Sequence, residues 1–173
     1  MRSRQLPSFF VAEDDPHDMF LFTRLLKGCG AANPLHLALH GDEAIELLGR
    51  VVEGNGLADH PSIVFLDVRM PKRSGLEVLA WVRQRPALAH VPVVILSGVD
   101  DPVEVQSARE LGAQCFLRKF PSARVVADVL AAAARFNERP ENRHFDLPGN
   151  MIGWPRQKSG ADAPHERLPL VRN

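Results

Sequence analysis

The feature that most constrains the fold is a regular alternation of short apolar runs with longer amphipathic segments. The short runs have the length of β-strands and lie at residues 9–12, 34–39, 63–66, 92–96 and 114–117. Apolar residues at helical spacing follow each run, and the predicted helices begin near Pro16, Gly41, Leu76, Pro102 and Ser122. Strands that alternate with helices form a parallel sheet with helices on both faces and right-handed crossovers. The chain is therefore predicted to have an α/β fold built from five strand–helix units.

The third of these runs ends in an acid. Residues 63–66 are all apolar, as expected for a strand buried on both faces of a parallel sheet, and Asp67 follows them directly. Open α/β sheets place their functional sites at the carboxyl edge of the strands. On this stretch alone, a site residue and a turn or capping aspartate are equally good interpretations of Asp67.

Polar residues also follow three other predicted strands. Glu13 and Asp14 follow the first strand, Ser97 the fourth and Lys119 the fifth. Parallel strands bring these ends to one edge, where clustered acids need a cation such as Mg²⁺ to neutralise them. Lysine and a hydroxyl suit the oxygens of a tetrahedral anion. The set predicts a site where the Asp67 carboxylate attacks a phosphoryl group.

Four segments carry a resemblance to a known family, namely residues 10–16, 65–71, 95–98 and 116–119. They resemble the receiver domain of two-component response regulators, in the order and spacing of that family. The resemblance implies a flavodoxin-like (βα)5 fold, a doubly wound parallel five-stranded sheet of strand order 2-1-3-4-5. It also implies that a sensor histidine kinase or a phosphotransfer protein phosphorylates Asp67, with Mg²⁺ as the cofactor.

The resemblance also implies a metal site and a phosphoryl site. Asp67 is the phosphoacceptor, and Lys119 pairs with a phosphoryl oxygen. The metal ligands are Glu13, Asp14 and Asp67, together with the backbone carbonyl of Arg69. These assignments lead us to expect Mg²⁺ beside the phosphoacceptor.

Two further positions match the conformational switch of the family. Ser97 is the switch hydroxyl that turns toward the phosphoryl group, and Phe116 is the switch aromatic that then moves inward. Asp15 falls at a variable position and is expected to cap the following helix.

The sequence departs from the family after the lysine. The usual proline is replaced by Phe120, so the Lys119–Phe120 bond is either trans with a rearranged loop or cis. Arg69 and Val99 occupy the two variable positions that flank the phosphoryl site. We expect Arg69 to alter the lifetime of the phosphoryl group.

Composition limits the partners and the location. Lysine plus arginine and aspartate plus glutamate both number 21, and this zero net charge gives no reason to expect binding to nucleic acid or to an anionic membrane. No apolar run approaches the roughly 18 residues of a membrane span, so a cytoplasmic protein is expected. The two cysteines, Cys29 and Cys115, fit neither a metal site nor a disulfide framework.

The predicted receiver domain covers residues 1–136, and residues 137–173 hold five of the 14 prolines. We interpret this second part as a tail without an effector domain. A standalone regulator that signals by protein contact is then expected. The long loop at residues 53–61 and the tail are similar to those of small regulators that serve phytochrome-type kinases.

The last predicted helix carries two apolar stripes. Val126, Leu130 and Ala133 form the stripe expected to face the core. Val125, Val129, Ala132 and Phe136 form a second apolar stripe. A helix with one solvent-exposed face is expected to carry only one such stripe. Either this stripe binds a partner, such as a second copy in a homodimer through helix four, strand five and helix five, or the tail covers it.

Two other function classes compete with a phosphoacceptor. A phosphatase with an aspartate nucleophile needs a second acid two residues later, and Arg69 stands there instead. A phosphorylation-independent interaction module would need none of the site residues, all of which are present. The preferred prediction is a signalling protein rather than an enzyme, with only self-catalysed phosphorylation and dephosphorylation of Asp67.

Overall fold

The computed structural model describes residues 8–31, 35–53, 61–138 and 145–147. Strands and helices alternate along the chain in the order β1 (Ser8–Ala12), α1 (Pro16–Gly28), β2 (Leu35–Ala38), α2 (Gly41–Val52), β3 (Pro61–Asp67), α3 (Gly75–Arg83), β4 (Val93–Ser97), α4 (Pro102–Glu110), β5 (Cys115–Arg118) and α5 (Ala123–Glu138). All strand pairs are parallel, and the sheet has the order β2-β1-β3-β4-β5. The predicted flavodoxin-like fold and its strand order are confirmed.

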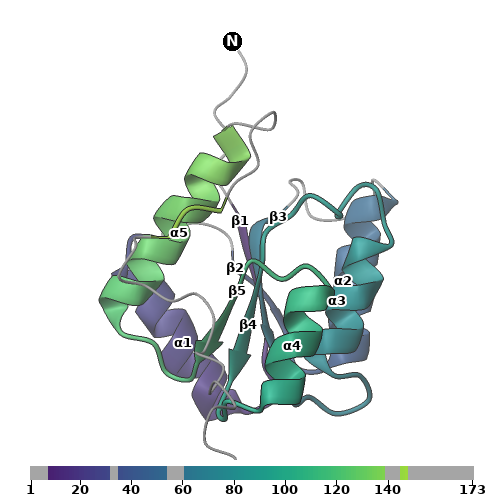
Figure 1. Cartoon of the computed structure of the whole chain (residues 1–173), viewed down its shortest axis with the longest axis horizontal. Coiled ribbons are helices and arrows are strands. Elements are labelled where there is room, and N and C mark those ends of the chain that lie inside the picture. Colours follow the sequence, from purple (N-terminus) through teal and green to yellow (C-terminus); the bar gives the residue numbers. More distant parts are fainter. Residues whose placement is uncertain (1–7, 32–34, 54–60, 139–144, 148–173) are drawn as a thin grey trace, which may run out of the picture.

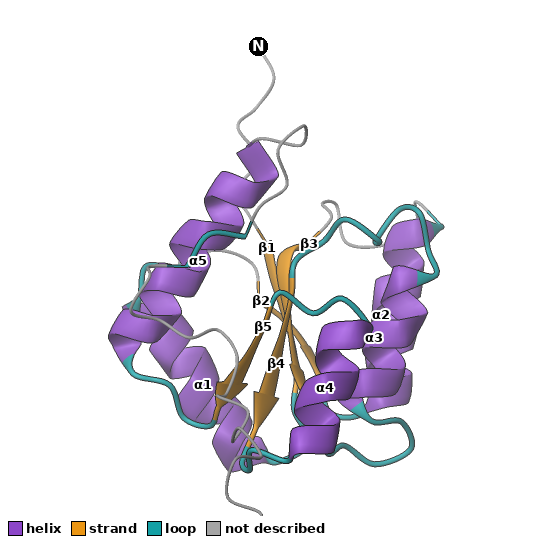
Figure 2. Ribbon diagram, viewed as in Figure 1, coloured by secondary structure: helices purple, strands orange, loops and turns teal. Residues whose placement is uncertain are grey.

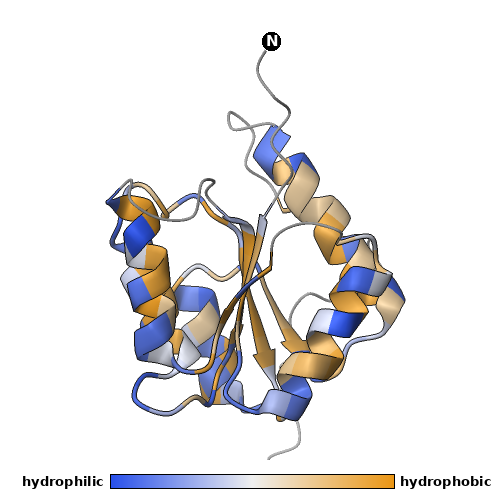
Figure 3. Cartoon of the chain, turned by 180° about the vertical axis from the view of Figure 1, so that it is seen from behind, coloured by the Kyte–Doolittle hydropathy of each residue, from blue (hydrophilic) through white to orange (hydrophobic). Residues whose placement is uncertain are grey.

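Helices cover both faces of this sheet (Figure 1 and Figure 2). α1 and α5 pack on one face, and α2, α3 and α4 pack on the other. Successive strand residues therefore enter two separate hydrophobic cores. Phe65 points toward α1, where its ring meets Phe22 edge-on at 5.0 Å between centroids, whereas Phe116 lies in the core beside α4. In Figure 3 the strands are mostly hydrophobic, and hydrophilic residues gather on the helices and loops.

β3 is a central strand with almost every residue buried. It starts at Pro61, two residues earlier than the apolar run suggests, because pairing with β1 already begins at Ser8. The Ser62 hydroxyl donates a hydrogen bond to the Ser8 carbonyl at 2.8 Å, so this polar residue is accommodated in the strand. The strand ends at Asp67, which places this acid at the carboxyl edge of the sheet.

Side-chain caps determine where two helices begin. Asp15 caps α1 by accepting hydrogen bonds from the backbone N–H groups of His17 and Asp18 at 2.8 and 2.9 Å, which confirms the predicted cap. α3 begins at Gly75, slightly before the predicted start, because Ser74 and Glu77 form a reciprocal capping box. Both caps lie at the same end of the sheet as Asp67.

The second apolar stripe of α5 is covered by the chain itself. Val129 and Ala132 are fully buried, and Phe136 is 7% exposed. The ring of Phe145 packs edge-on against Phe136 with 6.0 Å between centroids. Val129 belongs to the core between α5 and the sheet, contrary to its assignment to a second stripe, and residues beyond α5 contact the stripe at Phe136. The predicted homodimer stays a prediction.

Part of the remaining predictions falls outside the described residues. This holds for residues 139–144 and 148–173 of the predicted tail and for residues 54–60 of the long loop before β3. Among the described helices, none combines the length and the apolar character that crossing a membrane requires.

Candidate functional site

The strand ends meet as the topology requires. Ala12 of β1 lies opposite Leu66, Asp67 opposite Leu96, and Ser97 opposite Arg118. The residues that follow or end these strands therefore lie along one edge of the sheet. Glu13 is fixed there by its backbone N–H, which donates to the Ala38 carbonyl at 3.0 Å.

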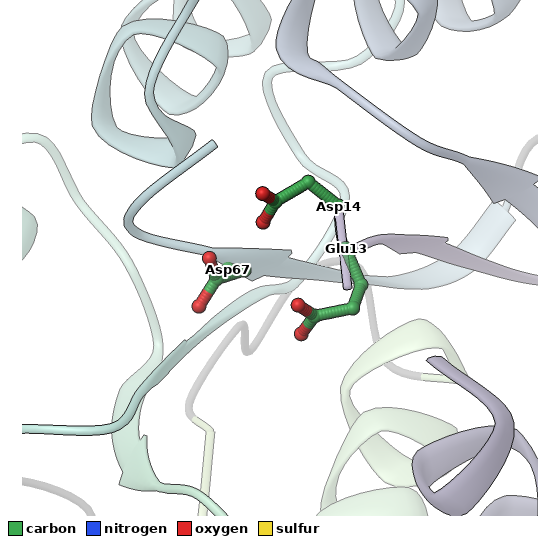
Figure 4. A group of neighbouring side chains, drawn as sticks. All are labelled: Glu13, Asp14 and Asp67. Carbon is green, nitrogen blue, oxygen red and sulfur yellow. The ribbon is translucent and has the colours of Figure 1, made fainter. Parts of the chain in front are cut away.

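Three carboxyl groups converge at this edge. Glu13, Asp14 and Asp67 each offer a carboxylate oxygen, and these oxygens lie within 4.8 Å of one another (Figure 4). Glu13 is 2% and Asp67 4% exposed. Burial, reinforced by the nearby charge of Asp67, raises the pKa of Glu13 despite its hydrogen bond with Lys119. Oxygen ligands at this spacing suit a hard divalent cation, which would offset their repulsion.

Lys119 places a cation beside the acids. Its Nζ lies 2.6 Å from Glu13 Oε2, 2.9 Å from Asp67 Oδ1 and 3.2 Å from Asp18 Oδ2. Burial alone would lower the pKa of Lys119, but hydrogen bonds with Glu13 and Asp67 outweigh it and raise this pKa above its usual value. The lysine is therefore held charged, with its three N–H donors shared among three carboxylates.

The two oxygens of Asp67 have different partners. Oδ1 contacts Lys119, and Oδ2 accepts a hydrogen bond from the backbone N–H of Arg69 at 3.0 Å. The peptide bond between Lys119 and Phe120 is cis, which answers the question that the sequence left open. Lys119 Nζ contacts Asp67 Oδ1 with Phe120 in the place of the usual proline.

The two predicted switch residues lie close to this edge but outside the acidic cluster. Ser97 ends β4, is 1% exposed, and accepts a hydrogen bond from the Val99 N–H at 3.3 Å. Phe116 is 2% exposed and belongs to the same core cluster as Val105 and Ala108 of α4. The structure therefore places Phe116 between the sheet and α4.

Two residues of this region were missed by reasoning from sequence. Asp18, in the first turn of α1, is the third carboxylate on Lys119, and helical spacing from the Asp15 cap could have suggested it. Glu104, in the first turn of α4, pairs with Arg69 at 3.1 Å. A separation of 35 residues gives no local signal for this second pair.

Comparison with known proteins identifies the fold family. Residues 9–130 match the model of the response regulator receiver domain. The chain belongs to the response regulator receiver family. Receiver domains are signalling proteins that interact with histidine kinases, and they are not enzymes in the usual sense.

Individual receiver proteins show the same relationship. The chain is 31% identical over 109 residues to the response regulator Rcp1 of Synechocystis sp. (strain ATCC 27184 / PCC 6803 / Kazusa), which covers 63% of this chain and 74% of Rcp1. The structure of the bacteriophytochrome response regulator AtBRR matches with a TM-score of 0.61 at 31% identity, over 69% of this chain and 86% of that one. The Mn(2+)-bound form of Rcp1 matches with a TM-score of 0.60 at 26% identity, over 73% of this chain and 93% of that one.

Proposed function

We propose that this receiver protein accepts a phosphoryl group on Asp67 from a histidine kinase and passes the signal on through protein contacts. The observation that carries the proposal is the position of Lys119 Nζ, 2.9 Å from Asp67 Oδ1, beside the cluster of Glu13, Asp14 and Asp67. The similarity to a bacteriophytochrome response regulator supports a phytochrome-type kinase, or a phosphotransfer protein downstream of one, as the donor.

The chemistry is a displacement at phosphorus. A carboxylate oxygen of Asp67 attacks the phosphorus of a phosphohistidine, so that a P–O bond forms and the P–N bond breaks. The departing imidazole keeps the electron pair of that bond and takes up a proton from water. Lys119 stabilises the charge on the phosphoryl oxygens during transfer. Hydrolysis of the resulting acyl phosphate by water restores the Asp67 carboxylate and releases phosphate.

The acidic cluster fits a magnesium ion. Glu13, Asp14 and Asp67 would hold it, with the backbone carbonyl of Arg69 as a further ligand, and hard oxygen donors of this kind are those that Mg²⁺ prefers. When bound, the ion would neutralise negative charge on the phosphoryl oxygens. Without a bound metal ion, the carboxylates of Glu13, Asp14 and Asp67 would repel an approaching phosphoryl group, because all three face the same space.

The output is a shift between two conformations. Ser97 turns its hydroxyl from the Val99 N–H toward the phosphoryl group, and Phe116 moves into the vacated volume. Because Phe116 packs in the core beside α4, this movement changes the surface formed by β4, α4 and β5.

The test is uptake of a phosphoryl group by the purified full chain. Incubation with acetyl phosphate and Mg²⁺ should add the mass of one phosphoryl group in intact-mass spectrometry, and EDTA should prevent it. Asp67→Asn should show no adduct because the amide is not a nucleophile. Asp128→Asn, on the α5 surface, is the matched control and should behave as the unmodified chain does. An unmodified chain that gains no adduct would favour the phosphorylation-independent interaction module.

A further inference from the structure

An ion pair links the loop after Asp67 to the first turn of α4. The guanidinium Nε of Arg69 donates to Glu104 Oε1 at 3.1 Å, while the backbone N–H of the same arginine donates to Asp67 Oδ2 at 3.0 Å. The Arg69 side chain is 63% exposed and that of Glu104 only 18%. One residue therefore contacts the acceptor carboxylate with its backbone and α4 with its side chain.

Glu104 depends on this arginine. Its second oxygen, Oε2, is buried and has no hydrogen-bond partner in the part of the chain that the structure describes. Buried carboxylate oxygens are costly to leave without a partner, and a buried charge whose counter-ion is removed is strongly destabilising. If Arg69 leaves, the Glu104 carboxylate must turn to solvent, which disturbs the first turn of α4 around it.

A phosphoryl group on Asp67 would compete for the same guanidinium. It carries about 1.5 to 2 negative charges near neutral pH and three strong acceptor oxygens, against one charge on Glu104. The phosphoryl oxygens would be attached to a residue only two positions from Arg69. The planar guanidinium could donate two hydrogen bonds to them, whereas it makes a single contact with Glu104, through Nε.

We propose that Arg69 changes partner on phosphorylation, holding Glu104 in the resting protein and a phosphoryl oxygen in the phosphorylated one. The inference rests on the proposed function of Asp67. It adds a connection from the β3–α3 loop to α4 that does not pass through Ser97 or Phe116. Because Glu104 and the phosphoryl group compete for one cation, each weakens the hold of the other, and this coupling is reciprocal.

Reciprocity gives the proposal a quantitative test with beryllium fluoride, which forms a tetrahedral phosphoryl-like adduct on aspartate carboxylates. Its affinity for the full chain in Mg²⁺ can be measured by ¹⁹F NMR titration. Arg69→Gln should weaken binding by roughly 5-fold or more, and Glu104→Gln should tighten it by a similar factor. In the double variant, Glu104→Gln should have no further effect, because the arginine over which the two anions compete is gone.

Arg73→Gln is the matched control. Arg73 lies in the same loop, is similarly exposed, and also pairs through Nε with a carboxylate, that of Asp42 at 2.7 Å. Its loss removes the same charge and should change the affinity by less than about 2-fold, as expected of an exposed pair. Hydrogen exchange gives a second measurement, since amides of α4 should exchange faster in Glu104→Gln and in the unmodified chain with beryllium fluoride bound.

The outcomes separate this proposal from the proposed function. If the unmodified chain gains a phosphoryl group from acetyl phosphate but the effects of the two substitutions on affinity simply add, Arg69 does not change partner and only this inference fails. Equal losses in Arg69→Gln and Arg73→Gln would reduce the effect to general charge and would also overturn it. If the unmodified chain gains no phosphoryl group, both proposals fail together.

Discussion

Gly75 holds Asp67 in place through close contact, and its replacement by alanine is the sharpest test of how the fold positions the site. A Cβ at position 75 would overlap the Asp67 carbonyl oxygen, and it would lie 2.9 Å from the Asp67 carbonyl carbon and 3.2 Å from Leu66 Cβ. Two of these three atoms belong to the backbone and cannot rotate away. The contact must open by more than about 1 Å to reach an ordinary van der Waals separation.

The magnitude follows from two losses. Overpacking against a rigid neighbour costs about 1–3 kcal/mol. The hydrogen bond from the Gly75 N–H to the Val68 carbonyl, 3.0 Å long, is strained or broken, for about another 1 kcal/mol. We expect Gly75→Ala to lower the free energy of unfolding by about 2–4 kcal/mol. Because a misplacement of about 1 Å can reduce a reaction rate by about 100-fold, phosphoryl uptake at Asp67 should fall by about 10- to 100-fold.

Urea unfolding followed by circular dichroism measures the first effect, and intact mass during incubation with acetyl phosphate and Mg²⁺ measures the second. Gly28→Ala is the control, because a Cβ there has no neighbour within 4 Å and the residue ends a helix. It should change the stability by no more than about 1 kcal/mol and leave phosphoryl uptake unchanged. A Gly75→Ala chain with normal stability and a normal uptake rate would refute the close packing of α3 against Asp67. Lower stability with normal uptake would refute the link from packing to chemistry.

Two further predictions concern stability. The Arg83 guanidinium donates hydrogen bonds to the carbonyl oxygens of Ala89, Val91 and Gly112 and to the side chain of Gln114. Arg83→Met should therefore lower the free energy of unfolding in urea by about 2–4 kcal/mol. If Arg83→Lys recovered most of this loss, a planar guanidinium would not be needed at this position. Burial lowers the pKa of His36 in the folded chain. As the pH falls below the ordinary pKa of imidazole, the unfolded chain therefore binds a proton at His36 more readily than the folded chain does. Stability should therefore drop from about pH 7 to about pH 5.5, and His36→Gln should reduce that drop in thermal unfolding scans; an equal drop in both chains would rule out His36 as a source.

The fold was predictable because local patterns and topology agree. Apolar runs followed by helical periodicity specify strand–helix units, and parallel pairing then brings the ends of distant strands to one edge. Asp67, Glu13 and Lys119 follow directly from this logic, and their side chains do meet. The cap at Asp15 was predictable for the same reason, since an acid before Pro16 satisfies backbone N–H groups only a few residues away.

What sequence could not supply are contacts between side chains on unrelated elements. Arg69 lies in the β3–α3 loop and Glu104 in α4, so their pairing depends on the distance between α4 and that loop. The cover of the second α5 stripe is a similar case. Periodicity revealed an excess of apolar residues on α5, but not whether the same chain or another molecule covers them. The configuration of the Lys119–Phe120 bond likewise depends on the surrounding loop.

Phe145 packs against Phe136 of α5, so this residue would compete with any other protein for the same face of α5. Any protein that binds this face of α5 must first displace Phe145 and break the hydrogen bond from Arg135 to the Asp146 carbonyl, 3.1 Å long. An aromatic pair of this kind contributes about 0.5–1.5 kcal/mol beyond its buried area. At the upper value, this term alone lowers the open population by about 10-fold, and the apparent affinity of a protein that binds there would fall by the same factor. These intrachain contacts of Phe145 and Asp146 would therefore weaken any association at this face of α5.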